Sequence, residues 1–130
     1  MIFADTHFFV AFLNERDADH QRALDASRSI RGPILTTEYV LIETANALAA
    51  VAFRTRFADF ARLLQTNSSI DMVWSTRALL SAGLALYSSR PDKDWSLTDC
   101  ISFTVIKQKR ISQALTHDHH FTQAGFRTLL

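Results

Sequence analysis

SLTDCISF, residues 96–103, brings a carboxyl group to the start of an apolar helix in this chain of 130 residues. The acid is Asp99, and the apolar periodicity after it predicts a helix over residues 97–109. Ser96 precedes the acid by three residues, which is the spacing of a capping box, where each side chain bonds the other's backbone amide. The local pattern therefore makes Asp99 a helix cap, and the rest of the chain decides whether the acid has a second role.

On both sides of this helix, short apolar runs alternate with longer segments of helical periodicity. The predicted strands cover residues 1–4, 33–36, 70–74, 113–116 and 126–130. The predicted helices cover residues 19–29, 38–52, 56–65, 76–88 and 97–109. Parallel strands need crossover connections, so this alternation predicts an α/β fold: a three-layer α/β/α sandwich around a mainly parallel sheet of about four to five strands.

The composition is that of one globular domain over residues 1–130, because 48% of the residues are hydrophobic. Lys and Arg number 14 against 13 Asp and Glu, so no overall charge excess points to a nucleic acid. The single cysteine excludes an internal disulfide and is typical of a reducing compartment. The longest apolar stretch, residues 39–53, is shorter than the roughly 20 residues of a membrane span. We expect a cytoplasmic protein without a membrane segment.

Two acids directly follow predicted strands, at the edge of the sheet where α/β proteins bind ligands. Asp5 follows the first strand and Asp118 follows the fourth. Glu43 falls on the stripe of helix 38–52 that is predicted to face the core, where a carboxylate needs an Arg, a hydrogen-bond network or a metal. Together with Asp99 these acids would repel one another at a shared edge. A hard cation such as Mg²⁺ or Mn²⁺, bound by oxygen ligands, is the usual remedy.

The ordered set of acids resembles the PIN-domain ribonucleases, and most closely the VapC-type toxins of bacterial toxin–antitoxin pairs. The matching segments are MIFADT, TTEYVLIETANAL, DWSLTDCISF and ALTHDHHFTQAGF, which together extend over residues 1–126. The resemblance implies a PIN-like fold and a metal-dependent endoribonuclease that hydrolyses RNA phosphodiester bonds. It also implies a cognate antitoxin protein and a toxin homodimer as partners.

The resemblance carries over residue by residue. It implies a catalytic quartet made of Asp5, Glu43, Asp99 and Asp118. Among these, Asp5, Asp99 and Asp118 are the implied metal ligands, and Glu43 is the residue that would orient or deprotonate the attacking water. Hydroxyl side chains are expected to support the acids, at Thr6, Ser96, Thr98 and Thr116. Asp94, five residues before Asp99, is an alternative for the third acid.

Several other interpretations stay open. His117, His119 and His120, with His7, invite a zinc site, but Cys100 has no C-x-x-C partner to complete one, and exposed loop histidines are the more ordinary interpretation. A phospho-accepting α/β domain is a second alternative, although the early acidic pair and late lysine of a receiver are absent. A catalytically silent PIN-like binding module is a third. Two groups of basic residues could bind RNA phosphates or be solvated helix faces: Arg54, Arg56 and Arg62, and Lys107, Lys109 and Arg110.

Overall fold

Five short strands lie where the apolar runs predict them. The computed structural model describes residues 1–130 and contains β1 (Ile2–Ala4), β2 (Ile34–Thr37), β3 (Ile70–Val73), β4 (Gln113–Leu115) and β5 (Arg127–Thr128). They form one sheet in the order β3-β2-β1-β4-β5, and every neighbouring pair is parallel. The predicted parallel sheet of four to five strands is therefore confirmed.

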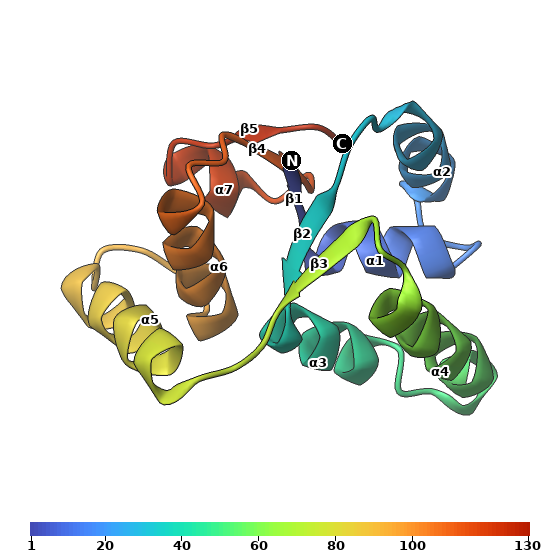
Figure 1. The fold of residues 1–130 in the computed structure, drawn as a ribbon, viewed down its shortest axis with the longest axis horizontal. Coiled ribbons are helices and arrows are strands. Elements are labelled where there is room, and N and C mark those ends of the chain that lie inside the picture. The colour runs from blue at the N-terminus through green and yellow to red at the C-terminus, as the bar shows by residue number, and fades with distance from the viewer.

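Helices cover both faces of this sheet. They are α1 (Thr6–Leu13), α2 (His20–Ser29), α3 (Glu38–Ala47), α4 (Val51–Thr66), α5 (Arg77–Ser89), α6 (Leu97–Gln108) and α7 (His119–Gln123). Figure 1 shows α5, α6 and α7 on one side of the strands and α1, α2 and α4 on the other. The predicted three-layer sandwich is confirmed. None of these helices is both long enough and apolar enough to cross a membrane.

The predicted helix over residues 38–52 is wrong in its second half. The segment divides after Ala47, where α3 ends, and α4 begins at Val51. Leu48, the residue after α3, is buried and follows the buried Val40 and Thr44 at spacings of four, so the core-facing stripe extends one residue beyond the end of the helix. Val51, predicted to continue the core-facing stripe, is 88% exposed. The helix predicted over residues 56–65 corresponds to α4, which begins five residues earlier, at Val51. Its start was missed because the prediction assigns residues 51 and 52 to the preceding helix.

Two short helices were not predicted. The first, α1, follows β1 without a break, so its apolar residues merge with those of the strand. The second, α7, spans only five residues. Both begin at one edge of the sheet, and their N-caps are Asp5 and Asp118.

The helix of the SLTDCISF segment, α6, contains more buried residues than any other helix of the molecule. Phe103 lies at its centre, with edge-to-face contacts to Trp95 at 5.0 Å and Phe121 at 5.0 Å between ring centroids. Cys100 is also buried, and desolvation raises the pKa of its thiol. A buried thiol with a raised pKa is chemically inert, so Cys100 serves packing.

Candidate active site

The pairing of β1 with β4 brings the ends of these two strands together. Ala4 lies opposite Leu115, and the backbone amide of Asp5 donates to the Leu115 carbonyl at 3.3 Å. Asp5 is only 2% exposed. The next residues after β4, Thr116 to Asp118, therefore lie beside the first acid, as the positions at strand ends predict.

Thr116 connects the two acids. Its hydroxyl donates to Asp5 Oδ2 at 3.2 Å and accepts the backbone amide of Asp118 at 3.0 Å. The second oxygen of the first acid, Asp5 Oδ1, is buried and has no hydrogen-bond partner. An unpaired buried carboxylate oxygen is costly, so it indicates a group that is missing from the protein chain alone.

Asp99 reaches the same edge from the start of α6. The capping box is present in full: Ser96 Oγ accepts the Asp99 amide at 3.0 Å, and Asp99 Oδ2 accepts the Ser96 amide at 2.9 Å. Burial raises the pKa of the Asp99 carboxyl, the bond from the Ser96 amide opposes this, and the charges of Asp5 and Asp118 raise it further. The mutual influence of these three carboxylates shows that they form one electrostatic group.

Two histidines complete the group, and both are among those that invite a transition-metal interpretation from sequence. His120 Nδ1 lies 3.2 Å from Asp99 Oδ2 and 3.4 Å from Asp118 Oδ1. His7 Nδ1 lies 3.3 Å from Asp5 Oδ2 and 3.9 Å from Asp118 Oδ2. The hydrogen bond with Asp5 raises the pKa of His7, although burial opposes the effect. Their positions follow from the short helices α1 and α7, which the sequence pattern did not reveal.

Glu43 joins the site through Thr6. The Thr6 hydroxyl donates to Glu43 Oε1 at 2.5 Å, which ties the middle of α3 to the first turn of α1. Glu43 is half-buried, which agrees with its predicted position on the core-facing stripe. No Arg contacts this carboxylate, and its partner is a hydroxyl group.

The donor set suits a divalent cation. Asp5 and Asp118 place carboxylate oxygens within 4.8 Å of each other, and the charges of both raise the pKa of Asp99, which belongs to neither of the groups below. One oxygen of Asp5 is buried without a partner, and hard cations stabilise such a set of carboxylates. Two groups of side chains place their ligand atoms within 4.8 Å of one another: Asp5, His7 and Asp118, and Asp118, His119 and His120. The residues present thus fit a metal ion.

Residues 2–127 match the family model of the PIN domain. The chain belongs to the PIN-domain family. It is 32% identical over 127 residues to the 23S rRNA-specific endonuclease VapC20 of Mycobacterium tuberculosis, covering 97% of this chain and 95% of that protein. This relationship confirms the VapC-type resemblance predicted from the sequence.

Solved structures agree with this assignment. The crystal structure of VapC20 from Mycobacterium tuberculosis, described as a toxin that cleaves the sarcin-ricin loop, matches with a TM-score of 0.89 at 28% identity. The match covers 97% of this PIN domain and 96% of that chain. FitAcB from Neisseria gonorrhoeae matches with a TM-score of 0.72 at 14% identity, over 100% and 97% of the two chains, which shows a shared fold.

The remaining predicted residues lie around the acids of this PIN domain at different depths. Thr98 is half-buried in the first turn of α6. Asp94, the alternative third acid, is exposed and belongs to a surface hollow lined also by Lys93 and Tyr87. Since Asp99 is the one held by the capping box and coupled to Asp5, the geometry favours Asp99 as the third acid.

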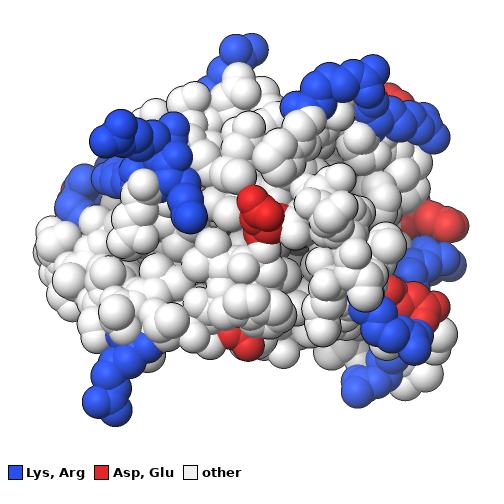
Figure 2. All heavy atoms as spheres, viewed as in Figure 1, with Lys and Arg blue, Asp and Glu red and all other residues white.

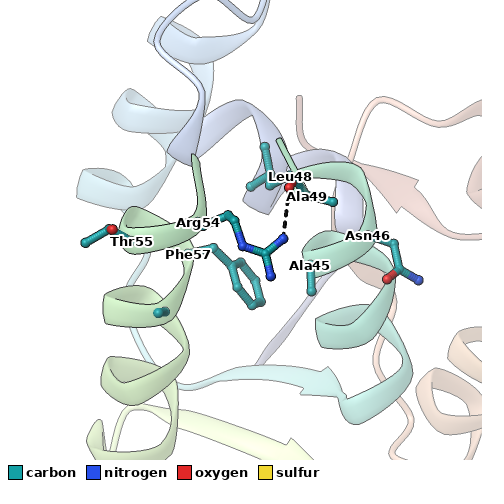
Figure 3. Close-up of a pocket in the computed structure, with 8 residues that line it drawn as sticks. Ala45, Asn46, Leu48, Ala49, Arg54, Thr55 and Phe57 are labelled. Carbon is teal, nitrogen blue, oxygen red and sulfur yellow. Dashed lines mark hydrogen bonds between the residues drawn. The ribbon is translucent and has the colours of Figure 1, made fainter. Parts of the chain in front are cut away.

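The basic residues of this PIN domain do not gather at the acids. Arg54 points into a hollow between α3 and α4 and donates to the Ala49 carbonyl at 3.1 Å (Figure 3). Arg56 donates to the Leu13 carbonyl at 2.8 Å. Lys107 lies at the opposite end of α6 from Asp99. Figure 2 shows one face of the molecule, on which the Lys and Arg side chains lie in separate groups, mostly towards the rim.

Proposed function

We propose that this PIN domain is a divalent-metal-dependent endoribonuclease and the toxin of a toxin–antitoxin pair. The observation that carries the proposal is the grouping of Asp5 and Asp118, whose ligand atoms lie within 4.8 Å, with Asp99 close enough for both charges to raise its pKa. Asp5 also has a buried carboxylate oxygen without a partner. The relationship to VapC20, which is named an endonuclease, supports the same activity. A phosphodiester is negatively charged, so three carboxylates alone would repel it.

Each acid has a proposed duty. Asp5, Asp99 and Asp118 would hold Mg²⁺ or Mn²⁺, and such a cation would supply neutralisation of the phosphate charge and a more acidic bound water. Thr116 holds Asp5 and the backbone of Asp118 in place by its two hydrogen bonds. Glu43, positioned by Thr6, would orient the attacking water or accept its proton.

The substrate that we propose is ribosomal RNA. VapC20 is named as specific for 23S rRNA, and its similarity to this chain extends over nearly the full length of both proteins. We further propose a cognate antitoxin that covers the acidic edge, and pairing with a second copy of the chain.

Replacing Asp5 with Asn tests the activity. Asn keeps the size of the side chain and can still accept the Thr116 hydroxyl, but it removes the charge that would hold the cation. We expect metal-dependent cleavage of ribosomal RNA, measured by electrophoresis of the fragments, to fall by about 100-fold or more. Growth inhibition on expression of the protein should disappear as well.

Asp94→Asn is the matched control, because Asp94 is an exposed acid only five residues from Asp99. This variant should cleave RNA at the wild-type rate. Unchanged cleavage by the Asp5→Asn variant, with a native circular dichroism spectrum, would contradict the metal-nuclease proposal. A wild-type protein that binds the cation but cleaves no RNA would instead favour the silent binding module.

A further inference from the structure

The imidazole of His7 is placed like a ligand of the proposed cation. Its Nδ1 atom is 3.3 Å from Asp5 Oδ2 and 3.9 Å from Asp118 Oδ2. Ligand atoms that share one cation at about 2.1 Å lie roughly 3.0 to 3.4 Å apart. The first distance falls within this range, and the second needs only a small movement of a side chain that is 45% exposed.

We propose that His7 supplies a nitrogen ligand to the cation held by Asp5 and Asp118, and that the site therefore prefers transition metals such as Mn²⁺ and Co²⁺ to Mg²⁺. This inference rests on the proposed function, since it concerns the cation of the same site. Imidazole is a good ligand for first-row transition metals, whereas Mg²⁺ prefers an environment of oxygen atoms.

The buried lone pair of Asp5 distinguishes this group from the other histidines. Asp5 Oδ1 is buried and without a partner, and it belongs to the carboxyl group that His7 contacts. His7 faces Asp5 Oδ2, which also accepts the Thr116 hydroxyl, and the unsatisfied oxygen is the other one of the same carboxyl group. In the neighbouring group, His119 and His120 both face Asp118 Oδ1, which accepts the backbone amide of His120 at 2.9 Å. Of the two groups, only that of His7 contains a carboxyl group with an unsatisfied buried oxygen.

His7 could alternatively act as a hydrogen-bond donor that only keeps Asp5 in its orientation. The two roles differ in their effect on metal preference. Loss of an orienting hydrogen bond would weaken the binding of every cation by a similar factor. Loss of a nitrogen ligand would weaken the binding of Co²⁺ far more than that of Mg²⁺, because only the transition metal gains substantial affinity from imidazole.

His7→Ala is therefore compared with wild type by calorimetric titration of the metal-free protein, first with Co²⁺ and then with Mg²⁺. We expect the Kd for Co²⁺ to rise about tenfold or more and the Kd for Mg²⁺ to change less than about threefold. Pulsed electron paramagnetic resonance of the Mn²⁺-loaded protein gives a second measurement. The coupling to an imidazole nitrogen should weaken in the His7→Ala variant.

His117→Ala is the matched control. The His117 ring lies 4.7 Å from the ring of His7 and is similarly exposed, but its Nδ1 is engaged by Asp19 at 2.9 Å. Both affinities should stay at the wild-type values in this control. Because both side chains are substantially exposed, neither substitution opens the core, and thermal melting of each variant checks the fold.

The nitrogen-ligand assignment would be overturned if the His7→Ala variant bound Co²⁺ and Mg²⁺ more weakly by the same factor, or if neither Kd changed. These outcomes would leave the proposed function intact, because the Asp5→Asn variant tests it separately. If Asp5→Asn still binds both metals and cleaves RNA, the metal-nuclease proposal fails, whatever the result for His7.

Discussion

Asp99 experiences opposing influences on its charge. Its position at the start of α6 and the amide of Ser96 favour the carboxylate, whereas burial and the charges of Asp5 and Asp118 favour the protonated form. Burial is the largest of these effects, and the pKa of Asp99 is raised. The native protein without metal therefore stores electrostatic repulsion at this residue.

Replacing Asp99 with Asn should stabilise the metal-free protein. The amide removes the charge but can still accept the Ser96 amide, so the helix cap is kept. At pH 7 the free energy of unfolding, measured by urea denaturation, should exceed that of wild type. The exposed Asp94 offers a control, since Asp94→Asn should leave this free energy within about 0.5 kcal/mol of wild type.

The advantage of the Asp99→Asn variant should depend on pH in a defined direction. Native Asp99 holds its proton more tightly than the unfolded chain does, so the stability of wild type falls as pH rises from the ordinary Asp pKa through the raised one. The excess in the free energy of unfolding of the variant over wild type should accordingly be largest at neutral pH and shrink as the pH is lowered towards about 4. An excess that grows on acidification would contradict the raised pKa of Asp99.

Single residues of the site were predictable from sequence where they lie at the end of a predicted strand or the start of a predicted helix. Asp5 and Asp118 follow apolar strands, and Asp99 follows a serine at capping distance. His7 and His120 were open to interpretation as metal ligands, but the carboxylates that they contact were not predictable, because those depend on which side chains the fold brings within reach. No local periodicity carries that information.

At the level of helices and strands, α5 and α6 form the closest packed pair. Gly83 faces Ile101 so closely that a Cβ atom at residue 83 would lie 2.3 Å from Ile101 Cγ1. Ile101 is 1% exposed and surrounded by the core, so it cannot move away easily. The absent side chain at Gly83 thus sets the distance between the two helices.

Gly83→Ala should destabilise the protein even though alanine favours helix. The gain in helix propensity is about 1 kcal/mol, and overpacking of a core contact costs typically 1–3 kcal/mol. We expect a net loss of roughly 1 kcal/mol in the free energy of unfolding. Combining Gly83→Ala with Ile101→Ala should restore part of the loss relative to the sum of the single variants. A more stable Gly83→Ala protein would show that the helices can separate without cost.

The limits of prediction at this scale have a physical cause. Strands and long amphipathic helices were found because apolar residues repeat over several turns. The break after Ala47 was missed because no Gly or Pro marks it and because Leu48 continues the apolar spacing beyond the end of the helix. Apolar periodicity in this segment therefore does not show where the helix ends.

For the whole molecule, one exposed apolar stripe remains to be covered. It runs along α5 and consists of Leu80, Leu84 and Tyr87, which are 36%, 43% and 51% exposed. Their spacing of four and three residues places them on one side of the helix. The contact with a second copy of the chain that we propose above would bury this stripe.

Leu84→Glu should therefore lower the mass of the protein in solution. A charge in an apolar interface is strongly unfavourable, and we expect light scattering after size-exclusion chromatography to report a monomer for the variant where wild type is a dimer. Leu63→Glu is the control, because Leu63 is also exposed but lies on α4. A monomeric wild type, or a Leu84→Glu variant that stays dimeric, would contradict this assignment.

The hydrogen bond between Thr116 and Asp5 joins residues 111 positions apart. During translation β1 leaves the ribosome long before β4, its neighbour in the sheet, because about 110 residues of chain separate the acid after β1 from the threonine after β4. A nascent chain that has been made as far as α6 already carries Asp5, Glu43 and Asp99 but lacks the strand that brings Asp118 beside them. The ribosome, whose own RNA is the proposed target, must thus synthesise the chain through β4 before the acidic group can assemble.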